Sequence, residues 1–134
     1  MPQISCVGRD GFTRIFEFRT AHDTLAATWT YRVTTIPAPQ GGHFFELTVA
    51  ELDSVTVRVV VVNHFNRGEY AAMGIPDALL PVIRAQLNRV VQSSPSRGTI
   101  GGVFRTAAAT KYWERLRTTG VANYDLQADI YLIP

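Results

Sequence analysis

The chain is organised around one buried strand, Val55-Thr56-Val57-Arg58-Val59-Val60-Val61-Val62. All of its residues except Arg58 are β-branched, and its second half is apolar on both faces. This pattern is typical of a strand in the middle of a sheet. The run is too short to cross a membrane. We therefore expect it at the centre of the sheet, with the rest of the chain extending or covering it.

A glycine turn and a helix follow this strand. Gly74-Ile75-Pro76-Asp77 precedes apolar residues at helical spacing, namely Leu79, Leu80, Ile83, Leu87, Val90 and Val91. We predict a helix over residues 77–88. Residues 90–94 fit either its last turn or a parallel strand, and we favour the strand. A second helix is predicted over residues 106–119, with Thr106 as its N-cap and Gly120 after its end.

Alternating apolar residues predict further strands on both sides of this unit. An Asp-Gly hairpin signal separates two of these segments, and residues 20–27 leave room for one or two helical turns only. The expected fold is α+β in a single domain over residues 1–134, with a mixed, mainly antiparallel sheet of six or seven strands and two packed helices. The strand segments outside the central unit are residues 4–7, 12–18, 28–34, 45–49, 121–124 and 129–133.

Composition excludes several classes of function. The 134 residues are 46% hydrophobic and 18% charged, and the formal net charge is only +2. Such a charge does not indicate nucleic-acid binding. The single cysteine, Cys6, excludes an internal disulfide, and the N-terminus lacks a signal-peptide pattern. We expect a cytoplasmic protein that binds neither nucleic acid nor membrane.

Common catalytic and metal-binding motifs are absent from the sequence. There is no cysteine pair, no His-Glu-x-x-His, no Gly-x-Ser-x-Gly and no P-loop. His22, His43 and His64 lie on three separate predicted loops or strand ends, and no two have ligand spacing. No metal site is expected.

One stretch carries a resemblance to a known family. Residues 69–80 follow the buried strand and open a helix, where backbone amides can point together at an anion. In order and spacing the stretch resembles the acyl-CoA-binding segment of the GNAT family of N-acyltransferases, whose pattern is Arg/Gln-x-x-Gly-x-Gly/Ala. Gly74 matches the first glycine, while Ala71 and Pro76 occupy the other two positions. Further on, Ala109-x-x-x-Trp113 resembles a helix that carries Ala-x-x-x-Tyr in the family.

The resemblance implies an acyl-CoA cofactor and an acyl transfer. The acceptor would be a small-molecule or peptide amine, and acetyl-CoA is the expected cofactor. The implied binding mode places pyrophosphate on the amides of residues 73–78 and the thioester carbonyl beside splayed strands near residues 61–63 and 91–93. Because Pro76 lacks an amide donor and Asp77 is negative, we expect weak binding. The implied cofactor-binding residues are Val61, Val62, Asn63, Met73, Gly74, Ile75 and Ala78.

The implied acyl transfer needs a base that takes a proton from the amine and an acid that gives a proton to the departing thiolate. Glu46 and Glu69 are the nearest candidates for the base. Tyr112 is the third catalytic candidate, adjacent to Trp113, which replaces the tyrosine of the family.

Two other interpretations remain open. The chain can be a non-catalytic domain of the same fold that binds another protein, or itself, through sheet edges and the loop over residues 37–42. It can also be an unrelated small α+β domain. A homodimer is expected if Trp29, Tyr31, Phe44 and Phe45 lack cover from their own chain. The N-terminal hairpin folding over these aromatics is the alternative.

Overall fold

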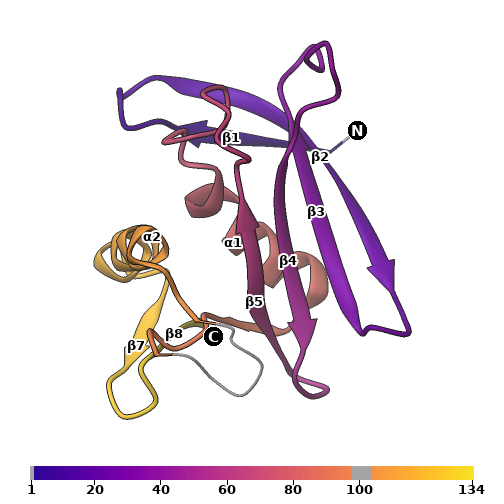
Figure 1. Cartoon of the computed structure of the whole chain (residues 1–134). Helices are drawn as coiled ribbons and strands as arrows, with labels where there is room; N and C mark the ends of the chain where they lie inside the picture. The colour runs from indigo at the N-terminus through magenta and orange to yellow at the C-terminus, as the bar shows by residue number, and fades with distance from the viewer. Residues whose placement is uncertain (1, 98–103) are drawn as a thin grey trace.

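Across residues 2–97 and 104–134, which the computed structural model describes, eight strands form one sheet in the order β1-β2-β3-β4-β5-β6-β8-β7 (Figure 1). Two helices accompany the sheet within the same residues. The elements are β1 (Gln3–Val7), β2 (Thr13–Asp23), β3 (Thr28–Thr34), β4 (Phe45–Glu51), β5 (Thr56–Asn63), α1 (Ile75–Leu87), β6 (Val90–Gln92), α2 (Ala107–Thr118), β7 (Asn123–Asp125) and β8 (Ile130–Ile133).

The topology combines an antiparallel meander with one helical crossover. Strands β1 to β5 pair with their sequence neighbours in antiparallel fashion. Helix α1 then returns the chain so that β6 pairs with β5 in parallel, as such crossovers require. The chain crosses again through α2, and the β7–β8 hairpin completes the sheet through an antiparallel β6–β8 pair. β5 therefore lies inside the sheet, as the sequence predicted.

The core lies between the meander and α1. Alternate residues of β3 and β4 point into it, so the burial pattern follows the period of a strand. Helix α1 covers this face with Ile75, Leu79, Leu80 and Ile83, all fully buried. Figure 1 shows α1 behind β4 and β5, with α2 beside it near the β7–β8 hairpin.

Two expectations about the fold are wrong. The sheet has eight strands among the described residues rather than six or seven, because both terminal hairpins join it. Residues 20–27 form no helical turn, because β2 continues to Asp23 and stays paired with β3 up to Thr28. A turn follows in which Asp23 Oδ1 accepts hydrogen bonds from the amides of Leu25 and Ala26, each at 3.1 Å.

The two helices lie close to their predicted positions. The Thr106 side chain caps α2 by accepting a hydrogen bond from the Ala109 amide at 3.1 Å, which confirms its predicted role. Within the described part of the chain, neither helix is long and apolar enough to cross a membrane.

The aromatic residues expected to lack cover are mostly buried. Trp29, Tyr31 and Phe45 are 9%, 0% and 2% exposed, and Phe44 packs edge-on against Phe65 at 5.2 Å between ring centroids. The argument for a homodimer from these side chains therefore loses its basis.

Candidate functional site

The two parallel strands at the centre of the sheet separate after a short pairing. β5 and β6 pair only from Thr56↔Val90 to Arg58↔Gln92, whereas β5 continues to Asn63 and stays paired with β4 on its other side. No strand among the described residues covers the edge of residues 59–63 that faces β6. This fork leaves a stretch of strand backbone open.

A β-bulge lies at the point where the strands part. Val49 is opposite Val59 and Thr48 is opposite Val61, so Val60 is an extra residue on β5. A bulge leaves its extra residue without a regular partner, bends the strand and is frequent beside active sites. Here it bends β5 at the mouth of the fork.

The apex of the fork is held by a serine. Ser94 is 4% exposed, and its hydroxyl donates a hydrogen bond to the Val59 carbonyl oxygen at 3.0 Å. The preceding residue, Ser93, is 1% exposed, and its amide donates to the Tyr131 carbonyl oxygen at 2.8 Å. The exit of β6 is therefore anchored on both sides, to β5 and to β8.

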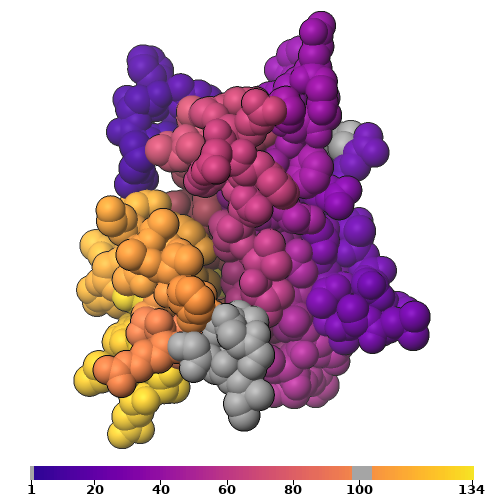
Figure 2. Space-filling view, in the orientation of Figure 1, coloured from indigo at the N-terminus to yellow at the C-terminus, as the bar shows by residue number. Residues whose placement is uncertain are grey.

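A cleft of about 290 Å³ lies in the fork, and we call it the fork cleft. One wall is the open edge of β5 and the other is the first turns of α2. Figure 2 shows this face, with the orange surface of α2 beside the magenta surface of β5. The lining residues are Val59, Val60, Val61, Val62, Asn63, Ser93, Ser94, Phe104, Arg105, Thr106, Ala109, Tyr112 and Trp113.

A buried arginine holds the base of the fork cleft. The Arg105 guanidinium donates to Ser93 Oγ at 3.3 Å, to the Ser94 carbonyl oxygen at 3.1 Å and to Asp129 Oδ1 at 2.8 Å. Its Nε donates to Thr110 Oγ1 at 2.8 Å, and its charge lies 4.8 Å from the centre of the Tyr131 ring. One side chain thus joins the exit of β6, the start of α2 and the start of β8.

The aspartate of this network is held in its charged form. Hydrogen bonds from Ser96, and then from Arg105 and Tyr124, keep the pKa of Asp129 well below its usual range. The Arg105–Asp129 pair therefore stays charged throughout the physiological pH range, and we assign it a structural role.

Tyr112 is the catalytic candidate that the structure places in the fork cleft. It is 7% exposed and lies on α2. Burial, and secondarily the charge of Asp77, raises the pKa of Tyr112 above its usual value. Its hydroxyl is therefore protonated at neutral pH and can act only as a donor or as an acceptor of a hydrogen bond, not as a base.

The two glutamates predicted as bases lie apart from each other. Glu46 lies on β4 opposite Asn63, which lines the fork cleft, and its carboxylate lies 3.6 Å from Arg32. Glu69 lines a separate hollow with Arg14 and Met73. Among the three candidates, Tyr112 lines the fork cleft and Glu46 is opposite a residue that lines it.

The predicted cofactor residues divide into two groups. Val61, Val62 and Asn63 line the fork cleft, as the open edge of β5. The second group packs around the start of α1: Met73 and Ala78 against the core, Ile75 fully buried, and Gly74 at the N-cap.

Gly74 is needed for a close approach of two backbone segments. A Cβ at this position would lie 2.2 Å from the Val7 carbonyl oxygen of β1, and the backbone φ of Gly74 is +76°. The Arg9 amide adds a hydrogen bond to the Ala72 carbonyl oxygen at 2.9 Å. The β1–β2 hairpin thus packs directly on the turn that the sequence suggested for pyrophosphate.

Sequence reasoning missed three residues of the site: Val60, Ser94 and Arg105. An isolated arginine or serine in a polar loop carries no local signal of burial. The bulge at Val60 depends on the pairing of β4 with β5, which the periodicity of β5 alone does not reveal.

The structure thus defines an α+β protein with one mixed sheet and a cleft at a strand fork. In the described part of the chain, no group of histidine, cysteine, aspartate or glutamate side chains is arranged to hold a metal ion. No protein-family model, curated protein sequence or solved structure matches the chain.

Proposed function

We propose that the fork cleft binds the pantetheine arm of an acyl-CoA such as acetyl-CoA, and that the protein transfers the acyl group to an amine. The observation that supports this proposal is the open edge of β5 beyond Arg58. Pantetheine is a narrow, extended chain that carries amide groups. Such a chain can pair with a free strand edge in the way that peptides add to sheets.

The shape of the fork cleft suits this ligand. Its two walls are a strand and a helix that diverge from the Ser94–Val59 hydrogen bond, so the cleft is closed at one end and open at the other. Val61, Val62 and Ala109 give it apolar surface, while the backbone of β5 supplies hydrogen-bonding groups. An apolar cleft with a few convergent polar groups is a typical small-molecule site.

In the transfer, the amine nitrogen bonds to the acyl carbon as the carbon–sulfur bond breaks. The amine loses a proton and the departing thiolate gains one. The acyl-CoA supplies the activated thioester. Tyr112 is the residue we assign to donate a hydrogen bond to the departing sulfur, because it lines the fork cleft and burial keeps its hydroxyl protonated. The thiolate takes its proton from solvent. Backbone N–H groups at the Val60 bulge are assigned to stabilise negative charge on the carbonyl oxygen.

Glu46 is the residue we assign to take the proton from the amine. It lies on β4 opposite Asn63, which lines the fork cleft, and its side chain is 22% exposed. The partner Arg32 is 59% exposed at its side chain, so the ion pair is accessible to an incoming amine. Glu69 has no role in this proposal.

The test is calorimetric titration of acetyl-CoA with a matched pair of variants. Ala109 faces the fork cleft, and Ala109→Phe fills it with a side chain. Ala108 is exposed on the same turn of α2, so Ala108→Phe adds an equal volume outside the cleft. We expect Ala109→Phe to weaken acetyl-CoA binding by roughly tenfold or more, because a filled cleft excludes the ligand, and Ala108→Phe to leave it unchanged. Equal binding by both variants, or no binding by the wild type, would reject the fork cleft as the site.

A further inference from the structure

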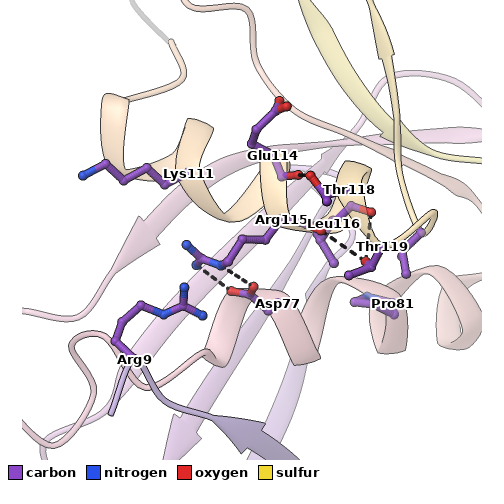
Figure 3. A pocket seen from close by; sticks show the side chains of 10 residues that line it. Arg9, Asp77, Pro81, Lys111, Glu114, Arg115, Leu116, Thr118 and Thr119 are labelled. Carbon is purple, nitrogen blue, oxygen red and sulfur yellow. Dashed lines mark hydrogen bonds and ion pairs between the residues drawn. The ribbon is translucent and has the colours of Figure 1, made fainter. Parts of the chain in front are cut away.

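A second concave surface lies on the other side of α2. It is a groove of about 730 Å³ between α1 and α2, bordered by the loop that joins β1 to β2, and we call it the helix groove (Figure 3). Pro81, Leu116 and Val121 give it an apolar floor. Five charged side chains line it: Arg9, Asp77, Lys111, Glu114 and Arg115. None of the residues that line it lines the fork cleft.

Both acidic residues of the helix groove already have cationic partners. Asp77 accepts two hydrogen bonds from Arg115, at 2.7 and 2.9 Å. Glu114 Oε1 accepts from Arg117 Nε at 2.7 Å, and Glu114 Oε2 accepts from the Tyr131 hydroxyl. These contacts hold the pKa of Glu114 below its usual value. Both carboxylates of the helix groove are therefore already paired with arginine side chains.

Two cations remain without a balancing charge. Among the residues that the structure describes, neither Arg9 nor Lys111 takes part in an ion pair. Lys111 and Arg115 are four residues apart and lie on the same side of α2. In Figure 3 the guanidinium groups of Arg9 and Arg115 lie near each other, beside Asp77. Because Arg117, which lies outside the lining, pairs with Glu114, two cations of the helix groove are left without a partner charge in the described part of the chain.

The backbone holds Arg9 at this position. Its amide donates to the Ala72 carbonyl oxygen at 2.9 Å, and Gly74 packs against Val7 two residues before it. The base of the Arg9 side chain is therefore fixed relative to the start of α1. Because the backbone that carries Arg9 is fixed before a ligand binds, less entropy is lost on binding.

We propose that the helix groove binds a small ligand that carries a phosphate group, with Arg9 and Lys111 contacting the phosphate. A phosphate monoester carries close to two negative charges at neutral pH, which matches the two unbalanced cations, whereas a carboxylate carries only one. Arginine is suited to phosphate oxygens through its planar fork of donors. Pro81, Leu116 and Val121 contact the apolar part of the ligand. This inference is independent of acyl transfer, because it uses none of the residues of the fork cleft.

The experiment is a titration of the protein with inorganic pyrophosphate at low salt, in which isothermal calorimetry measures the binding. Arg9→Ala combined with Lys111→Ala should weaken binding by roughly tenfold or more, because two charge-assisted contacts are lost. Arg19→Ala is the matched control, since Arg19 is exposed on β2 and far from the helix groove in the sheet. Circular dichroism verifies that each variant is folded. The proposal is overturned if the wild type does not bind pyrophosphate, or if the double variant and the control behave alike.

Two sources can supply the phosphate, and a second set of titrations separates them. Coenzyme A, dephospho-coenzyme A and pantetheine share the arm proposed for the fork cleft and differ in their phosphates. If the phosphates of the cofactor occupy the helix groove, the double variant weakens coenzyme A binding and leaves pantetheine binding unchanged. If pyrophosphate binds and none of the three does, the helix groove serves another phosphorylated ligand and the acyl-transfer proposal alone fails.

Discussion

The hydroxyl of Ser94 donates a hydrogen bond to the carbonyl oxygen of Val59 at 3.0 Å, and both residues are buried. The bond crosses from β6 to β5 immediately after the last paired residues, Arg58 and Gln92. It replaces the ladder hydrogen bond that would continue the pairing. A side-chain hydrogen bond therefore fixes the point at which the two strands separate, and the strands do not simply fray there.

Ser94→Ala should destabilise the protein and loosen the fork. The substitution leaves the buried Val59 carbonyl without a partner, which costs about 1–3 kcal/mol. Urea unfolding followed by circular dichroism measures the change. Ser5→Ala on β1 is the control, because Ser5 is exposed and its loss should stay within about 0.5 kcal/mol. Equal stability of the two variants would show that the Ser94 bond is dispensable.

Tyr112→Phe should lower the turnover number with little effect on the affinity for acetyl-CoA. In the proposed mechanism the substitution removes a hydrogen bond to the departing sulfur, and loss of one such donor lowers the rate by roughly 10²- to 10³-fold. Release of free thiol from acetyl-CoA, with an amine as acceptor, gives both kinetic parameters. Tyr124→Phe provides the comparison, because Tyr124 also loses a hydroxyl but lies on β7, with its hydroxyl bonded to Asp129. A Tyr112→Phe protein with full turnover would remove Tyr112 from the mechanism.

Gly74→Ala should be more damaging than Gly120→Ala. Both glycines have positive φ, +76° and +82°, so an alanine is strained by about 1–2 kcal/mol at either position. Only at Gly74 does the added Cβ meet another atom, the Val7 carbonyl oxygen at 2.2 Å; at Gly120 nothing lies within 4 Å. Thermal unfolding of the two variants isolates the effect of the contact. Similar unfolding temperatures of the two variants would mean that β1 shifts away from the added Cβ at residue 74 at little cost in free energy.

The stability of the protein should fall as the pH rises above about 9. Burial, and secondarily the charge of Asp77, raises the pKa of the Cys6 thiol to about 12. Between the unfolded and folded pKa values the unfolded chain binds fewer protons than the folded chain, so deprotonation favours unfolding, by up to about 1.4 kcal/mol per pH unit. Chemical unfolding at pH 9 and pH 10 measures this slope. Cys6→Ala should reduce the dependence of the unfolding free energy on pH. An unchanged slope would show that groups other than Cys6 cause the dependence.

The local elements were predictable because their signals are local. Strict alternation in β3 and β4 and the β-branched run of β5 give each strand its period directly. Thr106 and the apolar spacing of α1 located both helices within a few residues. The extension of β2 to Asp23 was not predictable in this way, because its partner is Thr28 and the pairing rather than propensity sets its length.

The candidate site was predictable only where it follows from a single strand. The family resemblance pointed to Val61, Val62 and Asn63, and these residues of β5 line the fork cleft. Gly74 was named because it matches a glycine of the family pattern, whereas the need for glycine there, a φ of +76° and the close Val7 carbonyl oxygen, comes from the tertiary fold. The helix groove joins Arg9 to Lys111 across most of the chain, and only the tertiary fold brings them together.

The meander has a consequence for synthesis of the protein on the ribosome. Strands β1 to β5 are adjacent in space in the same order as in the sequence, so each can pair as soon as it emerges. Their apolar face, with Phe16, Tyr31 and Leu47, has no cover until α1 has been made. A nascent chain that has emerged from the ribosome as far as residues 63–75, but no further, therefore presents a five-stranded meander with one bare hydrophobic face. In that interval the nascent chain is a substrate for chaperones and is prone to aggregation.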